Sequence, residues 1–294
     1  FFRTLDAVAR VSDLDTQRHV TSRTYEAFCW EGRLDMLASL GLPLAEMLEH
    51  TILLNPELTH CSFHREQQAG SQMVVHSWME LAQDRLHFYQ EIQDSAGELV
   101  CKIATKYTAR REGESLSSQQ IQELLDLSKA ASADRQPAEF IASLPAISPG
   151  KPECKTVPTQ LRVGYSDRTP FFDYQPGAFW RFIEEARWEF STAIGLDQKR
   201  ILEYDTVTFF TSGTFHIFRQ PVAGEILRVE TWIHRIEKIR CFLRSDVYDA
   251  EGNVVLCNIE EQLIVSLSRR RPRRAGPEFL HLVEEFIEVQ PEQS

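Results

Sequence analysis

The sequence predicts an α+β protein built from two repeats, each of which wraps an antiparallel sheet around a central helix. Three observations support this prediction. The chain is similar to itself at a distance of 154 residues, each copy holds one amphipathic helix, and four β-like runs follow each helix. A length of 294 residues is enough for two such units.

The internal repeat is an ungapped correspondence over more than sixty residues. Shifted by 154 residues, Ser12-Asp13 falls on Ser166-Asp167 and Gly41-Leu42 falls on Gly195-Leu196. The same shift aligns Phe28 with Phe182, Glu31 with Glu185, Arg33 with Arg187, Arg65 with Arg219, Gly70 with Gly224 and Trp78 with Trp232. One inserted residue then aligns the turns DSAGE and DAEGN. The chain therefore contains two copies of one unit.

Each copy begins with a strand-like run, at 7–11 and at 160–165, which leads into a polar loop and then a helix. The helix carries apolar residues at spacings of three and four, which build one buried stripe. This stripe consists of Tyr25, Phe28, Cys29, Met36 and Leu40 in the first copy and of Phe179, Phe182, Ile183, Ala186, Phe190 and Ile194 in the second. Thr21 or Ser22 is expected to cap the first helix, and glycines 41 and 195 to end the two helices.

The β-like runs after each helix are joined by short turn signals, which predicts an antiparallel meander. These runs cover 51–64, 71–83, 85–94 and 98–110 in the first copy, and 205–218, 225–237, 240–249 and 253–268 in the second. A further helix is expected over 118–131, before a Pro-rich connector, and another over 278–289. The predicted domains are an N-terminal repeat (1–111), a linker with a helix (112–156), a C-terminal repeat (157–270) and a tail with a short helix (271–294).

Charge and composition exclude several classes of protein. The net charge of −11 argues against nucleic acid as a partner, and no stretch is long and apolar enough for a membrane span. A local exception is the basic run Arg269, Arg270, Arg271, Arg273 and Arg274. A solvated basic tail is the simpler interpretation of this run, and contact with phosphates of a cofactor or carrier is the alternative.

The six cysteines are widely scattered and show no CxxC spacing. They therefore predict neither a disulfide framework nor a zinc site. Buried free thiols are typical of a reducing cytoplasm, which is the compartment we expect. His60 and His64 share one strand face, but without further ligands they predict no metal site.

The polar loop of the first copy reads SDLDTQRHV (12–20), and that of the second reads SDRTPFFDY (166–174). Asp13 recurs in both copies, which indicates a structural role. Asp15, Gln17 and His19 occur in the first copy alone. A carboxylate can activate water or attack a carbonyl carbon, so these three are candidate catalytic residues.

The order Asp13-Leu14-Asp15, then His19-Val20, then Tyr25 entering a helix resembles the hotdog-fold thioesterases. The segment Glu31-Gly32-Arg33-Leu34 is similar to the E-A-R-L of the same superfamily. Within this superfamily, the pattern is similar to those of the 4-hydroxybenzoyl-CoA-thioesterase-like and acyl-ACP-thioesterase-like families. The resemblance implies a double hotdog that hydrolyses an acyl-CoA or acyl-ACP thioester to the free acid and a thiol.

By this resemblance Asp15 is the general base or nucleophile, and the N-terminus of the helix is the oxyanion site. Gln17 and His19 would position water or polarise the carbonyl, and Glu66 matches the glutamate of a family Glu-Cys pair whose cysteine is replaced here by Gln67. The expected substrate-binding residues are Val20, Thr21, Ser22 and Tyr25. Four positions of the loop depart from the family pattern, namely Gln17, Arg18, Thr21 and Ser22.

The resemblance further implies a site formed by the loop of one repeat and the helix of the other. Because the second loop has lost the carboxylate and gained Pro170, Phe171 and Phe172, we expect one working site and one degenerate pocket. No metal or cofactor is expected beyond the CoA or phosphopantetheine of the substrate. The repeats would form an intramolecular pseudo-dimer, which can pair again as a homodimer.

The recurrence of Glu31 and Arg33 as Glu185 and Arg187 predicts a structural ion pair within each helix. Two other functions remain open at this point. One is a hotdog hydratase or dehydratase that acts on acyl thioesters. The other is a non-catalytic acyl-thioester-binding protein, since several family-typical residues are substituted.

Overall fold

A computed structural model describes residues 1–15, 18–126, 128 and 147–289. Its contacts divide the chain into two compact units. Unit 1 holds Phe1–Pro145 and Ser166–Trp180, and unit 2 holds Ala146–Tyr165 and Arg181–Ser294. In the part of the chain so described, no helix combines the length and the apolar character that crossing a membrane requires.

Unit 1 contains an antiparallel sheet with the strand order β2, β5, β4, β3, β1. Its strands are β1 (Phe2–Val8), β2 (Ile52–Phe63), β3 (Gln72–Ala82), β4 (Arg85–Asp94) and β5 (Leu99–Arg111), with the short β6 (Glu114–Ser115) beside β5. The predicted meander is confirmed here. β1 begins and ends earlier than the predicted run at 7–11, because residues 2–8 pair with residues 72–78 of β3.

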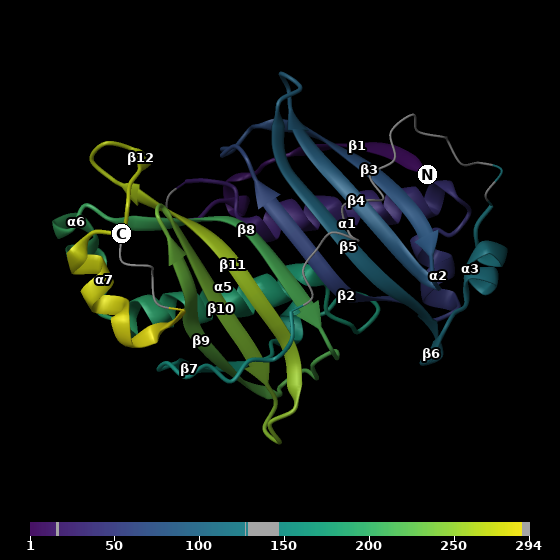
Figure 1. Ribbon diagram of the computed structural model, residues 1–294. Helices are drawn as coiled ribbons and strands as arrows, with labels where there is room; N and C mark the ends of the chain where they lie inside the picture. The colour runs from purple at the N-terminus through teal and green to yellow at the C-terminus, as the bar shows by residue number, and fades with distance from the viewer. Residues whose placement is uncertain (16–17, 127, 129–146, 290–294) are drawn as a thin grey trace. The chain divides into compact units, whose positions relative to one another are not determined.

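The central helix of unit 1, α1 (Ser22–Ser39), lies along one face of this sheet (Figure 1). Thr21 caps it as predicted, and Gly41 follows it with a φ of 88°, a conformation that favours glycine. The core between α1 and the sheet includes Met36, Leu37, Phe88 and Tyr107. Two short helices complete this part, α2 (Leu44–Glu49) and α3 (Ser118–Leu124).

Unit 2 repeats the arrangement. Its antiparallel sheet runs β8, β11, β10, β9, with β7 on the far edge of β9. The strands are β7 (Val157–Arg162), β8 (Val207–Ile217), β9 (Ile226–Glu237), β10 (Arg240–Tyr248), β11 (Val254–Ser266) and β12 (Arg271–Pro272). The helices are α5 (Pro176–Ala193), whose later residues lie in this unit, and α6 (Gln198–Glu203).

Two of the helix predictions were wrong at their C-terminal ends. The helix expected over 118–131 ends at Leu124, because Leu125 is already extended; residues 127 and 129–131 lie outside the described residues. The helix expected over 278–289 is α7 (Pro277–Val283) followed by the 3-10 turn η4 (Glu284–Phe286) and a strand, β13 (Ile287–Val289). β13 pairs in parallel with residues 233–235 of β9, on the part of that edge beyond the residues that β7 covers, and Ile287 is buried there.

The polar loop of the second repeat belongs to the first unit by its contacts. Ser166–Trp180, which include this loop and the first turn of α5, cluster with the first repeat. Phe171 of this loop is buried in the core of unit 1 together with Phe88 and Tyr107. Both polar loops of the chain are therefore described within unit 1.

Candidate functional site

The first polar loop is a closed turn between η1 (Val11–Asp13) and α1. Leu14 and Val20 form an antiparallel bridge across it, and the Asp15 N–H donates to the His19 carbonyl over 2.9 Å. Arg18, whose N–H donates to the Asp15 carbonyl over 3.0 Å, has a φ of 69°. Arg18 thus adopts a left-handed conformation, which glycine would adopt without steric cost.

Asp13 holds the loop to its surroundings. Its carboxylate accepts a hydrogen bond of 2.7 Å from the Arg10 N–H, and its carbonyl accepts one of 3.0 Å from the Thr21 N–H. The Thr24 hydroxyl also donates to this carbonyl, over 3.4 Å. These bonds join both ends of the loop, so Asp13 has the structural role that its presence in both repeats predicts.

Three of the four predicted catalytic residues lie together in this loop and beside it. The His19 N–H donates to an Asp15 carboxylate oxygen over 3.0 Å, and the His19 Nε2 lies 3.2 Å from a Glu66 carboxylate oxygen. The His19 side chain is 27% exposed and that of Glu66 is 66% exposed. Glu66 comes from the connection between β2 and β3 rather than from a strand. Gln17, the fourth residue, lies outside the described residues.

The predicted substrate-binding residues surround the start of α1. The Thr21 hydroxyl accepts the Thr24 N–H over 3.2 Å, which caps the helix, and the Val20 N–H donates to the Gln67 carbonyl over 2.9 Å. Val20 and Tyr25 are buried, whereas Thr21 and Ser22 are half-buried. The site thus combines an exposed polar turn with the N-terminus of a helix, whose first amides carry partial positive charge.

Aromatic side chains pack behind this turn. The Tyr25 ring lies 5.6 Å from the Phe63 ring, and the Phe63 ring meets Trp180 edge-on at 5.9 Å. Burial raises the pKa of Tyr25, and the negative charge of nearby Glu66 adds to the effect, so the phenol stays neutral.

The second polar loop has the same backbone with different side chains. The Thr169 N–H donates to the Asp173 carbonyl over 3.0 Å, the Phe172 N–H donates to the Thr169 carbonyl over 3.0 Å, and Phe172 has a φ of 63°. Thr169 stands where the first loop has Asp15, and Asp173 stands where it has His19. The Thr169 hydroxyl donates to the Asp173 carboxylate. In this loop the two residues at the positions of Asp15 and His19 are therefore hydrogen-bonded to each other.

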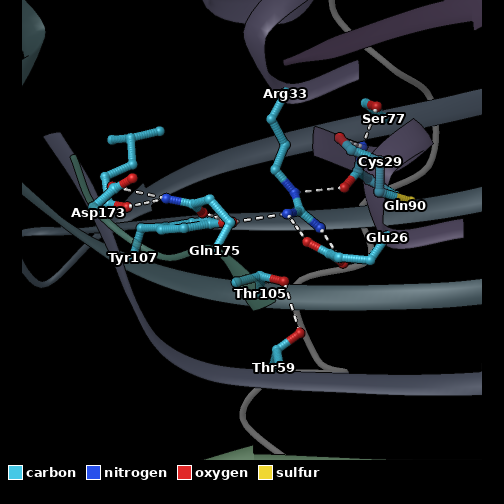
Figure 2. A network of polar contacts seen from close by, with 11 residues as sticks. Glu26, Cys29, Arg33, Thr59, Ser77, Gln90, Thr105, Tyr107, Asp173 and Gln175 are labelled. Carbon is cyan, nitrogen blue, oxygen red and sulfur yellow. Dashed lines mark hydrogen bonds and ion pairs between the residues drawn. The ribbon is translucent and has the colours of Figure 1, made fainter. Parts of the chain in front are cut away.

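Asp173 is buried, and it begins a chain of polar contacts that Figure 2 shows. The Gln175 amide donates to Asp173 over 2.9 Å and to the Leu54 carbonyl over 3.0 Å. The Tyr107 hydroxyl in turn donates to the Gln175 amide oxygen over 3.1 Å. Burial raises the pKa of Asp173, while the hydrogen bonds from Thr169 and Gln175 act in the opposite direction. This loop serves as an anchor in the interior of unit 1.

This series of polar contacts, which starts at Asp173, ends at Arg33 on α1 (Figure 2). The Arg33 side chain is fully buried. Its guanidinium donates to both carboxylate oxygens of Glu26, over 2.5 and 3.1 Å. It also donates to Gln90 and to the Tyr107 hydroxyl, each over 2.7 Å. Burial alone would lower the pKa of Arg33, but the adjacent Glu26 carboxylate raises it instead. The guanidinium is therefore fully paired and charged.

The predicted pairing of Glu31 with Arg33 was wrong. Glu31 is exposed, because residues two apart on a helix point to nearly opposite sides, whereas Glu26 lies two turns from Arg33 on the same face. In the second repeat Glu185 is likewise exposed, and Arg187 lies 3.5 Å from the buried Glu260 of β11. The recurring feature is thus a helix arginine whose carboxylate partner differs between the repeats.

Sequence reasoning missed four members of this buried network, Glu26, Gln90, Tyr107 and Gln175. The spacing of seven residues between Glu26 and Arg33 is the one signal in the sequence that pointed to a shared helical face. Among the described residues, the group of three side chains close enough to share a metal ion is Glu46 and Glu49 on α2 with His50 directly after it, and all three are exposed. The polar loop is not part of that group.

No model of a known protein family matches the sequence, and no curated protein matches it either. The structure is nevertheless similar over most of its length to several solved structures. One is a protein from Lactobacillus plantarum assigned as an oleoyl thioesterase, at 10% identity and a TM-score of 0.72, covering 90% of this chain and 96% of that one.

Two other similar structures are acyl-ACP thioesterases. The 12:0-ACP thioesterase from Umbellularia californica has 12% identity and a TM-score of 0.66, with 90% of this chain and 94% of that one covered. An acyl-ACP thioesterase from Bacteroides thetaiotaomicron has 10% identity and a TM-score of 0.60, with 89% and 97% covered. These similarities confirm the predicted α+β double-hotdog fold.

Proposed function

We propose that this chain, which has the double-hotdog fold of solved acyl-ACP thioesterases, hydrolyses an acyl-CoA or acyl-ACP thioester to the free acid and a thiol. One observation carries the proposal: Asp15, His19 and Glu66 lie together immediately before the N-terminus of α1. A thioesterase needs a base or nucleophile, a group that orients water or the carbonyl, and donors for an oxyanion. This turn offers all three.

Asp15 acts as the base or as the nucleophile. As a base, it takes a proton from a water molecule whose oxygen attacks the carbonyl carbon of the thioester. The C–S bond breaks as the tetrahedral intermediate collapses, and the departing thiolate takes up the proton. As a nucleophile, the carboxylate attacks the carbonyl carbon, and the C–S bond breaks to release the thiolate and leave an anhydride. Water then hydrolyses the anhydride, which regenerates the Asp15 carboxylate and gives the free acid, while the thiolate takes up a proton from that water. The hydrogen bond from the His19 N–H holds the carboxylate in place for either route.

His19 orients the attacking water or polarises the carbonyl. When its Nε2–H donates to Glu66, the Nδ1 atom is the ring nitrogen left for the reaction. The amides of Ser22 and Arg23, the first two of α1, are the donors that we assign to the developing oxyanion. We assign Gln17 to the same turn on sequence grounds, and Val20, Thr21 and Tyr25 to contacts with the substrate.

The second loop supports a single working site. It has Thr169 where the first loop has Asp15, its Asp173 is engaged with Thr169 and Gln175, and its Phe171 fills the core of unit 1. We therefore propose that the second pocket does not hydrolyse thioesters. None of the six cysteines forms a disulfide, which supports a reducing compartment, and we propose that the protein acts in the cytoplasm.

Release of free thiol from a panel of acyl-CoA and acyl-ACP thioesters tests the proposal. We expect turnover of at least one saturated acyl thioester, and its loss in the Asp15→Asn variant. Addition of water to enoyl thioesters without thiol release would instead make the chain a hydratase. Tight binding of the thioesters without any turnover would make it a binding protein.

A further inference from the structure

The inner face of the sheet in unit 1 changes from apolar to polar with distance from the proposed site. Four neighbouring strands each place one apolar side chain in the row nearest the first polar loop, namely Val75, Ile92, Cys101 and Phe63. The Phe63 ring lies 5.6 Å from the ring of Tyr25 in the first turn of α1. Hydrocarbon is more stable against this apolar row than in water, so an acyl group held at the loop would extend along it.

Behind this row the same face carries buried polar side chains. Ser77 and Gln90 stand opposite each other in the second row, where the Gln90 amide donates to the Ser77 hydroxyl and to the Cys29 carbonyl, each over 2.8 Å. Two threonine hydroxyls share a hydrogen bond of 2.9 Å in the third row. With the ion pair on α1 and the phenol on β5, these groups lie in one belt across unit 1 (Figure 2). We call it the polar belt, and its buried members are Glu26, Arg33, Thr59, Ser77, Gln90, Thr105 and Tyr107.

The helix α1 presses directly on the polar belt at Gly32. A Cβ atom at this position would lie 2.9 Å from the Ser77 hydroxyl oxygen and 3.1 Å from the Gln90 amide nitrogen, which is closer than such atoms normally approach. This contact closes the space between α1 and strands β3 and β4 to a hydrocarbon chain. Beside Gly32, the Arg33 guanidinium bridges from the helix to Gln90 on β4 and to Tyr107 on β5. The polar belt therefore separates the first row from the large apolar core of unit 1 behind it.

The fold does not require a belt of this composition. The repeat shift places Trp180 where the first repeat has Glu26, and in unit 2 the helix arginine Arg187 instead lies 3.5 Å from Glu260 of β11. Arg187 is also partly exposed, whereas Arg33 is fully buried. A belt centred on a fully buried ion pair therefore belongs to the repeat that carries the proposed site.

We propose that the polar belt limits the acyl group of the substrate to short chains, no longer than hexanoyl. This inference rests on the proposed function and names the substrate class of the same site. A longer chain that follows the first row meets the belt, and it can continue only if Glu26 and Arg33 separate or lose their partners. Either change leaves a buried charge against hydrocarbon, which is strongly unfavourable. A short chain ends in the first row and leaves the polar belt intact.

The test combines the chain-length preference of the wild-type protein with one pair of variants. Glu26→Ala with Arg33→Met, the belt variant, removes both charges together, so no charge stays buried alone, and the flexible Met side chain can move aside. Arg187→Met with Glu260→Ala makes the same change in unit 2 and is the control. The value of kcat/KM is measured from butanoyl-CoA to hexadecanoyl-CoA, and urea unfolding checks that each variant is folded. The dissociation constants of non-hydrolysable thioether analogues of hexanoyl-CoA and dodecanoyl-CoA are measured by calorimetry.

We expect the wild-type protein to favour hexanoyl-CoA over dodecanoyl-CoA by roughly tenfold or more in kcat/KM. The belt variant should lower this ratio roughly tenfold through a gain on dodecanoyl-CoA, and the control should keep the ratio within about twofold of wild type. Equal or faster turnover of dodecanoyl-CoA by the wild type would overturn the proposal. An unchanged ratio in a folded belt variant, or an equal change in the control, would overturn it as well.

The binding measurement separates this inference from the proposed function. If no thioester is hydrolysed, the proposed function fails, but tighter binding of the hexanoyl analogue would still support the limit on chain length. Equal or tighter binding of the dodecanoyl analogue would overturn that limit. The wild-type profile and the analogue binding need no variant, so they decide even if the belt variant does not fold.

Discussion

The two polar loops of this chain share a backbone but differ in what their side chains do. The Asp15 N–H donates to the carbonyl four residues later in the first loop, and the Thr169 N–H does the same in the second. In each loop the residue before that carbonyl has a positive φ. The first loop presents Asp15 at its surface and joins His19 to Glu66. The second loop buries Asp173 and ties it to Thr169 and Gln175.

This difference separates scaffold from chemistry within one molecule. Because both copies form the turn, the turn does not depend on Asp15 or His19, which supports a chemical rather than a structural role for these two residues. The second copy has used the same positions for an internal anchor that reaches Arg33 through Gln175 and Tyr107. A repeat that has diverged in this way is an internal control for every residue of the proposed site.

The largest effect on stability is expected from the buried arginine of the first repeat. Arg33→Met leaves the Glu26 carboxylate buried without a partner and removes donors to Gln90 and Tyr107, which should cost about 3–5 kcal/mol of unfolding free energy. Urea unfolding of the purified variant measures this loss.

Arg187→Met in the second repeat is the matched control. Its arginine is partly exposed, lies 3.5 Å from Glu260 and stacks over the Phe210 ring at 5.2 Å. Burial already raises the pKa of the Glu260 carboxyl, so that it can become neutral. We expect a loss of about 1–2 kcal/mol. Equal losses in the two variants would show that the network of Figure 2 adds nothing to the first repeat.

A smaller effect, on activity, is expected from Glu66→Gln. The repeat shift places Gln220 at the corresponding position, so this variant gives the first repeat the residue of the second. It keeps a hydrogen-bonding group beside His19 but removes the charge. Charge-assisted bonds are worth about 1 kcal/mol more than neutral ones, so kcat should fall roughly fivefold. Steady-state kinetics measure this change. A lower kcat at an unchanged unfolding free energy would support the role of Glu66 beside His19, and an unchanged kcat would remove Glu66 from the site.

The smallest effect is expected from Asp173→Asn, and it has a defined dependence on pH. An asparagine can accept from Gln175 and donate to Thr169, so stability at neutral pH should change by less than about 1 kcal/mol. Since burial raises the pKa of Asp173 above its ordinary 3.8, ionising it costs the folded state free energy as the pH rises through the raised value. The variant should therefore gain stability relative to wild type as the pH rises above the ordinary value of 3.8. A relative loss over that range would contradict the buried position of this carboxyl.

Much of the fold was predictable because it is encoded locally and then repeated. Apolar residues at helical spacing defined α1 and α5, and short turn signals separated the strands of each meander. The capping by Thr21 and the role of Asp13 also followed from neighbouring residues in the sequence.

What could not be predicted depends on residues far apart in the chain. The partners of Arg33 are Glu26 on its own helix but also Gln90 and Tyr107 on two strands, and Gln175 lies 68 residues beyond Tyr107. The strand at Ile287–Val289 forms because β9 offers an open edge, which no local pattern reveals. Glu66 was named a site residue only through the resemblance to known thioesterases, and its contact with His19 was not predicted.

The central claim is that the chemistry belongs to the first loop alone. The most direct test is the initial rate of thiol release from one acyl thioester by the wild type, Asp15→Asn and Asp173→Asn at equal concentrations of folded protein. We expect Asp15→Asn to lower the rate roughly 10³-fold, as the loss of a general base or nucleophile does, and Asp173→Asn to stay within about twofold of wild type. A wild-type rate in Asp15→Asn, or a collapse of the rate in Asp173→Asn, would contradict the claim.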